Sequence, residues 1–273
     1  MSYFKLKDGE ELYYEMIGGG KDTVIMLHGW TDDHTTFLKP VQILKYKARC
    51  ILYDYRGHGG SKGAGTKNIT IDTLADDLHE LILGLNVKNI TLIGWSMGAS
   101  VAFTYIKKYD CDQLRQVVLC DMTPKLLNGD GWHLGLYQTK YTAQDVEQDN
   151  EKAFLSLYTA LTVGIIPKLK RILHFRLKHD VKNRSADCDE AALKSLYHSM
   201  MLQDNRTVVE KITIPFTYFY ADPGSLFSPE LALWYRVYVH CPFKAVKFSD
   251  SSHMLITEQP KKFAEEIEKL LYD

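Results

Sequence analysis

Short runs rich in β-branched and aromatic residues alternate along this chain with stretches of helical periodicity. The strand-like runs cover residues 3–6, 11–17, 23–29, 50–55, 89–94, 116–120, 214–220 and 244–248. Such alternation requires right-handed crossovers and a largely parallel sheet, with helices on both faces and sites at the carboxyl ends of the strands. We therefore expect an α/β fold with eight strands. The first two runs have no helix between them and should form an antiparallel edge.

Three segments have the pattern of helices. Behind Thr70, a candidate N-cap, apolar residues recur at spacings of three and four up to Leu85. A second helix is expected from Ala99 to Tyr109. The third begins near Pro260, which a first helical turn tolerates, and continues to the C-terminal end.

The interval from about 125 to 210 breaks the alternation. It contains no convincing strand, but apolar residues near Phe154 and again near Ile165 have helical spacing. We therefore predict a core domain made of residues 1–124 and 210–273, with residues 125–209 inserted as a helical cap.

Composition excludes several classes of protein. Lys and Arg number 33 against 34 Asp and Glu, so there is no global field to hold a nucleic acid or an anionic membrane. No run approaches the ~18 apolar residues of a membrane span, and the N-terminal segment does not resemble a signal peptide, so a cytoplasmic protein is expected. The five cysteines are far apart and odd in number, which favours buried apolar roles over disulfides or a metal site.

The pattern Gly94-Trp95-Ser96-Met97-Gly98 lies between an expected strand and an expected helix. A serine that is to act as a nucleophile here must sit in a strained, tight turn, and small residues two before and two after allow the backbone to pack that closely. The strand before and the helix after are the context this motif requires. We interpret Ser96 as a nucleophile.

A serine hydroxyl needs a base to remove its proton, so a histidine must be brought to it by the fold. Of ten histidines, His253 follows the polar run Ser249–Ser252, which we expect to be a loop between the last strand and the last helix. That position would deliver it to the carboxyl edge of the sheet. We therefore predict His253 as the general base.

Acyl transfer also needs donors aimed at the developing oxyanion, each contributing roughly 3 kcal/mol. The strand before residue 28 ends in His28-Gly29-Trp30, which offers the backbone N–H of Trp30 at a neighbouring strand end. The backbone N–H of Met97, directly after Ser96, is the second predicted donor.

Four segments together resemble the α/β-hydrolase superfamily: HGW at 28–30, DYRGHGGS at 54–61, GWSMG at 94–98 and SSHM at 251–254. The GWSMG segment is similar to the esterase and cofactor-free haloperoxidase-like branches. The resemblance implies an eight-stranded sheet, a triad in the order Ser, acid, His, a cap over the pocket, and no metal or organic cofactor. It implies a role in loop architecture, without chemistry, for Asp54, Arg56 and His58.

The acid of the triad departs from the family pattern. In the family it usually follows the seventh strand, four residues before a proline; here that proline is Pro229 and the position holds Ser225, with Asp222 where a glycine belongs. Some members instead carry the acid at the end of the sixth strand, where this chain has Asp121. We favour Asp121 and retain Asp222 as the alternative acid, with a weakened dyad as a third option.

Aromatic residues of the expected cap are candidates for a substrate pocket, although packing within the cap is their more frequent role. They are Trp132, Tyr137, Tyr141, Phe154 and Tyr158. In a pocket they would favour an apolar or aromatic acyl or alcohol group. The basic stretch 169–184 is more typical of a solvated helix face than of a binding patch.

These residues predict a serine hydrolase that acts on a small carboxylic ester or lactone through an acyl-enzyme. Perhydrolysis of the haloperoxidase type and hydrolysis of a carbon–carbon bond would use the same groups and remain alternatives. A ligand-binding protein with a degenerate triad is the alternative outside enzymes. The expected partner is a small ester-like molecule; the oligomeric state is open, with a homodimer as one option.

Overall fold

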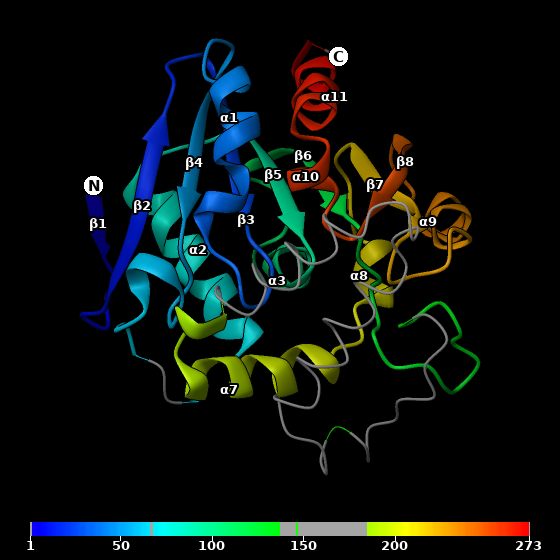
Figure 1. The fold of residues 1–273 in the computed structure, drawn as a ribbon, viewed down its shortest axis with the longest axis horizontal. Coiled ribbons are helices and arrows are strands. Elements are labelled where there is room, and N and C mark those ends of the chain that lie inside the picture. Colours follow the sequence, from blue (N-terminus) through cyan, green and yellow to red (C-terminus); the bar gives the residue numbers. More distant parts are fainter. Residues whose placement is uncertain (1, 66–67, 137–145, 147–184, 273) are drawn as a thin grey trace.

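A computed structural model describes residues 2–65, 68–136, 146 and 185–272. Its centre is a sheet with the strand order β1-β2-β4-β3-β5-β6-β7-β8 (Figure 1). The strands are β1 Ser2–Lys5, β2 Glu11–Ile17, β3 Asp22–Leu27, β4 Ala48–Tyr53, β5 Ile90–Trp95, β6 Leu114–Cys120, β7 Phe216–Gly224 and β8 Phe243–Ser252. Within this sheet of the described residues, the pairings β1–β2 and β2–β4 are antiparallel and the other five are parallel. The eight strands and the antiparallel edge predicted from the sequence are confirmed.

Helices cover both faces of this sheet. They are α1 Leu38–Leu44, α2 Ile71–Gly84, α3 Met97–Tyr109, α7 Glu190–Met201, α8 Arg206–Val209, α9 Leu231–Tyr238, α10 Leu255–Glu258 and α11 Pro260–Tyr272, with the 3-10 turns η1 His34–Phe37 and η2 Gly59–Ser61. The three helices predicted from periodicity are present as α2, α3 and α11. Thr70 caps α2 through its side chain, which accepts the N–H of Thr73.

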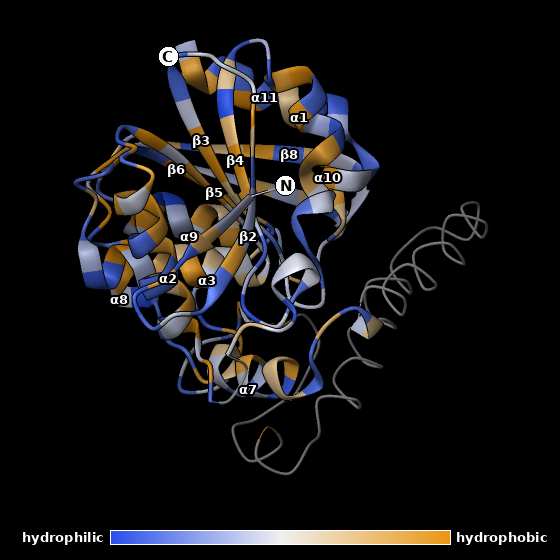
Figure 2. Ribbon diagram, turned by 90° about the vertical axis from the view of Figure 1, so that its left-hand side faces the viewer, coloured by the Kyte–Doolittle hydropathy of each residue, from blue (hydrophilic) through white to orange (hydrophobic). Residues whose placement is uncertain are grey.

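Two apolar clusters lie on opposite faces of the sheet. In the ribbon of Figure 2, orange apolar residues are found in the central strands and in the helices on both sides of them. One joins the inward sides of α2, α3 and α9 to one face of the strands. The other joins α1 and α11 to the opposite face. Because both faces are covered, the central strands β3, β5 and β6 are almost continuously buried and read as apolar runs.

The run Ser249–Ser252 is not the loop expected from its polar composition. It is the last part of β8, which pairs with β7 up to the partners Gly224 and Ser252. Backbone hydrogen bonds to the neighbouring strand decide this, whatever the polarity of the side chains. His253 therefore follows directly on a paired strand.

Part of the predicted cap is described. Helix α7 packs beside α2, and the hydroxyl of Ser195 donates to the carbonyl of Ile69 at 2.7 Å. Residues 137–145 and 147–184 lie outside the described residues, so the division into core and cap stays a prediction. Among the described helices, none is long and apolar enough to cross a membrane.

All five cysteines are free thiols, and four of them are buried, as expected from their spacing. Burial raises the pKa of the Cys50 thiol to about 12, which disfavours the reactive thiolate.

Candidate active site

Ser96 lies in the turn between β5 and α3 with φ 54° and ψ −122°, a conformation that costs an L-residue energy. The glycines on either side allow this turn to pack closely. A Cβ at Gly94 would lie 2.5 Å from the carbonyl oxygen of Gly98, and one at Gly98 would lie 2.2 Å from that of Leu27. These clashes explain why the pattern has glycine at both positions, and the tight turn is the geometry that the predicted nucleophile elbow requires.

His253 and Asp121 form a buried pair. Nδ1 of His253 lies 2.7 Å from Oδ2 of Asp121, and both side chains have no exposed surface. The other carboxylate oxygen, Oδ1, accepts the backbone N–H of Ala221 at 3.1 Å. Because a carboxylate only accepts hydrogen bonds, this contact fixes the imidazole in the tautomer whose Nδ1 carries the proton.

The backbone of His253 is held on both sides. Its N–H donates to the carbonyl of Gly224 at 2.9 Å, and its own carbonyl accepts the indole N–H of Trp95 at 2.9 Å. Trp95 is the residue before Ser96, and its ring centroid lies 5.4 Å from that of the imidazole. The nucleophile elbow and the histidine are therefore tied together by one side chain.

A second connection joins the elbow to the acid. The backbone N–H of Ser96 donates to the carbonyl of Cys120 at 3.1 Å, and Cys120 directly precedes Asp121. Ser96, Asp121 and His253 thus meet at the carboxyl edge of the sheet, each just beyond the end of its own strand.

The segment predicted to supply an oxyanion donor lies against Ser96. A Cβ at Gly29 would be 3.3 Å from the Cβ of Ser96 and 2.8 Å from the Trp95 ring, so the chain passes the elbow closely here. Trp30 follows, with its indole N–H donating to the carbonyl of Leu193 in α7 at 3.0 Å. Met97 is the first residue of α3, where backbone N–H groups lack intrahelical acceptors. The role of the two amides stays a prediction.

The alternative acid lies elsewhere. The carboxylate of Asp222 forms an ion pair with Lys247 on the neighbouring strand and is one-third exposed. Ser225, in the position where the family usually has its acid, is buried, and its hydroxyl accepts the N–H of Phe227 at 3.0 Å. The structure thus places Asp121, and not Asp222, against His253.

Trp132, the described member of the predicted pocket residues, is buried among protein groups. Its indole N–H donates to the carbonyl of Lys125 at 2.8 Å, and its ring meets that of Trp234 edge to face with centroids 5.1 Å apart. Its pocket role stays a prediction. Tyr137, Tyr141, Phe154, Tyr158 and the basic stretch 169–184 lie outside the described residues.

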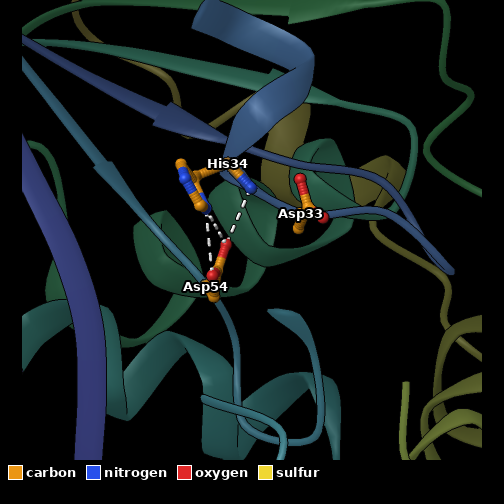
Figure 3. Close-up of side chains that lie close together, drawn as sticks. All are labelled: Asp33, His34 and Asp54. Carbon is orange, nitrogen blue, oxygen red and sulfur yellow. Dashed lines mark hydrogen bonds and ion pairs between the residues drawn. The ribbon is translucent and has the colours of Figure 1, made fainter. Parts of the chain in front are cut away.

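Asp33, His34 and Asp54 bring potential metal-ligating atoms within 4.8 Å of one another (Figure 3). The Asp54 carboxylate already accepts N–H groups of His34 and Gly60 at 2.7 and 2.8 Å, and the His34 imidazole at 2.8 Å. Both oxygens of the Asp54 carboxylate thus already accept hydrogen bonds from the protein's own donors. We assign this cluster to the architecture of the loops after β3 and β4, the role expected for Asp54.

In this cluster the pKa values of Asp54 and His34 are both shifted in the direction that favours the charged form. Burial opposes the charged carboxylate, but the hydrogen bond and charge of His34 outweigh it, and the pKa of Asp54 is lowered. Burial likewise opposes the imidazolium of His34, and the same contacts outweigh it and raise the pKa of His34. Arg56, also expected to be architectural, binds the carboxylate of Asp77 through Nε and Nη2, both at 2.7 Å.

A model of the alpha/beta hydrolase fold family matches residues 22–258. The chain belongs to the α/β-hydrolase family. This α/β-hydrolase is 24% identical over 268 residues to a pimeloyl-[acyl-carrier protein] methyl ester esterase of Nitrosospira multiformis, with 92% of this chain and 95% of the relative covered. A non-heme chloroperoxidase of Kitasatospora aureofaciens is 33% identical over 124 residues, which are 44% of each chain.

Among solved structures, an esterase from Exiguobacterium antarcticum superposes with a TM-score of 0.83 at 22% identity, and the match covers 100% of this chain and 99% of the other. At that identity the likeness establishes the fold alone. The sequence matches, and not this superposition, relate the α/β-hydrolase to an esterase and to a non-heme chloroperoxidase.

Sequence reasoning missed the groups that hold the pair of Asp121 and His253 in place. The motif fixes glycines and a serine but leaves position 95 variable, so nothing in the pattern indicates an indole donor aimed at His253. The N–H of Ala221 and the carbonyl of Gly224 belong to the backbone of β7 and depend on where that strand ends. The sequence signal nearest to these groups is the apolar run before Asp222, which indicates a strand there but does not show where that strand ends.

Proposed function

We propose that this α/β-hydrolase is a carboxylic ester hydrolase that cleaves a small ester or lactone through an acyl-enzyme on Ser96. The observation that carries the proposal is the buried 2.7 Å contact between His253 and Asp121, at the same sheet edge as the strained turn of Ser96. Acyl transfer requires a nucleophile, a base that takes its proton, and an acid that orients the base, and these are the roles proposed for Ser96, His253 and Asp121.

In the proposed reaction the Ser96 hydroxyl attacks the substrate carbonyl while Nε2 of His253 takes its proton. The backbone N–H groups of Trp30 and Met97 stabilise the oxyanion of the tetrahedral intermediate. Collapse of that intermediate breaks the bond to the alcohol, which leaves with the proton returned from His253. Water then repeats the sequence and releases the acid, while Asp121 holds the imidazole and stabilises its charged form.

A panel of nitrophenyl esters with short and long acyl chains tests the proposal. We expect turnover by the wild type, and loss of several orders of magnitude in Ser96→Ala with unchanged folding, because only binding and the oxyanion donors remain. Near-normal turnover in Ser96→Ala would exclude this mechanism. The ranking of acyl chains reports the substrate class.

Perhydrolysis is a second candidate because the chain is related to a non-heme chloroperoxidase. In that reaction hydrogen peroxide replaces water as the acceptor of the acyl group, so a peracid forms and Ser96 is regenerated. Adding peroxide and a carboxylic acid to the same enzyme distinguishes the two: formation of peracid that depends on Ser96 supports perhydrolysis, and its absence leaves hydrolysis alone.

A further inference from the structure

The two residues before His253 are hydrogen-bonded to one carboxylate, that of Glu258 at the end of α10. Oε2 of Glu258 accepts the hydroxyl of Ser251 at 2.7 Å and the backbone N–H of Ser252 at 2.7 Å. Oε1 accepts the hydroxyl of Ser252 at 2.9 Å. Three neutral donors from the two residues before His253 thus converge on one anionic acceptor.

The contacts continue past the histidine. The hydroxyl of Ser252 also accepts the backbone N–H of Met254 at 3.2 Å, so the residues on both sides of His253 belong to one hydrogen-bonded group. Ser251 and Ser252 are buried, 3% and 2% exposed. Hydrogen bonds to a charged acceptor are about twice as strong as neutral ones, and buried donors that lose their acceptor pay a desolvation cost.

The helix that bears Glu258 is too short to hold this position by itself. Helix α10 has four residues, and the backbone N–H of Glu258 donates to the carbonyl of Met254 at 3.0 Å. A turn of this length gains little from its own hydrogen bonds. The carboxylate therefore closes a small loop, residues 251–258, around the residue proposed as the base.

We propose that Glu258 is a positioning residue for His253, which acts by fixing the two residues before it, while Trp95 and Gly224 hold the backbone of His253 itself; the inference rests on the proposed function. In this role Glu258 acts through Ser251 and Ser252 and not on the reacting atoms. Its effect is on the placement of Nε2 relative to Ser96, and a displacement of about 1 Å at a reacting group costs on the order of 10²-fold in rate.

Glu258→Gln tests the role because it keeps the shape and removes the charge and one acceptor oxygen. An amide N–H₂ then faces buried donors that need an acceptor. We expect kcat with a nitrophenyl ester to fall ~10- to 100-fold, with KM within about twofold, since placement of the base and not substrate binding is altered. The matched control is Glu265→Gln on α11, a half-exposed carboxylate paired with Lys261, which should leave kcat unchanged.

Ser252→Ala provides a second variant in case Glu258→Gln does not fold. It removes one donor to Glu258 and the acceptor for Met254, and it should lower kcat in the same direction by a smaller factor. For either variant, kcat is measured well below the melting transition. A variant that melts at a lower temperature but keeps kcat within twofold of wild type would overturn the proposal and leave Glu258 a purely structural residue.

A second readout does not depend on esterase activity. The Nδ1 proton between His253 and Asp121 should give a low-field NMR resonance in protein labelled with ¹⁵N-histidine, assigned by its loss in His253→Gln. We expect Glu258→Gln to shift or broaden this resonance and Glu265→Gln to leave it in place. A shifted resonance in a protein without any esterase activity would refute the proposed function and support the positioning role; an unchanged resonance together with unchanged kcat would refute the positioning role.

Discussion

At the scale of single residues, the carboxylate of Asp121 has a donor for each oxygen. Ala221 supplies a backbone N–H to Oδ1, and His253 supplies Nδ1–H to Oδ2. The backbone of Asp121 is also placed with φ 47°, a left-handed conformation that aspartate tolerates better than most residues. Both the side-chain contacts and the backbone conformation of Asp121 thus fix the carboxylate beside His253.

Asp121→Asn should lower turnover on the order of 10⁴-fold, the scale of losing a triad carboxylate, because the amide favours the wrong tautomer of His253. Asp222→Asn is the matched comparison: it removes only a partly exposed ion pair with Lys247 and should change turnover less than twofold. Kinetics and melting temperatures of both variants measure this. A larger loss of turnover in Asp222→Asn would reverse the assignment.

The sequence could name Asp121 but could not separate it from Asp222. Both follow apolar runs that end at the same sheet edge, and their difference lies in where each strand stops. Strand β7 continues through Asp222 to Gly224, which keeps that carboxylate beside Lys247. Strand β6 ends at Cys120, which leaves Asp121 beyond its end. Strand ends depend on pairing with neighbours and not on local composition.

At the scale of elements, the turn between β5 and α3 is tightly packed at both of its glycines, Gly94 and Gly98. Gly98, the second residue of α3, lies against the carbonyl of Leu27 in β3, with no room for a Cβ. The same close approach brings the strand end that carries Gly29 against Ser96.

Gly98→Ala should lower the free energy of unfolding by about 1–3 kcal/mol, because its Cβ overlaps a backbone carbonyl that cannot move without shifting β3. Turnover should fall as well, since the shift reaches Ser96. Gly63→Ala is the control, because a Cβ there meets nothing within 4 Å. Denaturant unfolding of the three proteins decides it: equal stability of Gly98→Ala and wild type would contradict the close packing.

Periodicity predicted the elements whose apolar pattern is long and regular and missed those that are short. Helix α2 has fourteen residues with a clear apolar face and was predicted together with its cap at Thr70. Helices α1 and α9 have seven and eight residues and were not predicted, since two turns give too few repeats. The polar end of β8 was predicted as a loop because its pairing with β7 leaves no mark on composition.

At the scale of the whole molecule, stability toward acid depends on histidines that the fold buries without charge. His58 is fully buried and its Nδ1 donates to the carbonyl of Arg56 at 3.0 Å. Burial, together with the nearby His28, lowers the pKa of His58 to about 3. Burial also lowers the pKa of His28. An unfolded histidine has a pKa of about 6.5.

Between about pH 6.5 and pH 3 the unfolded chain binds a proton at His58 that the folded protein does not, so stability falls as the pH falls through this window. The slope should reach about 1.4 kcal/mol per pH unit for one histidine. His58→Gln should be less stable at pH 7.5 and show a smaller slope. Exposed His240 is the control: His240→Gln should keep the wild-type slope in denaturant titrations from pH 7.5 to 5. An unchanged slope in His58→Gln would contradict this.

The fold is kept while most of the sequence differs, as the TM-score of 0.83 at 22% identity with the Exiguobacterium esterase indicates. In this chain the alternation of buried strands and amphipathic helices is the part of the fold that the sequence pattern predicts directly. The proposed chemistry rests on a few residues at strand ends. Covalent chemistry at Ser96 is therefore the claim on which the functional account depends.

Reaction with a fluorophosphonate followed by intact and peptide mass spectrometry tests that claim most directly. We predict a single phosphonyl adduct, located on Ser96, absent in Ser96→Ala and formed more slowly in Asp121→Asn, because attack on phosphorus needs the same base and oxyanion donors. A folded wild-type protein that forms no adduct, or an adduct that persists in Ser96→Ala, would contradict the account and favour a binding protein that keeps the fold without the reaction.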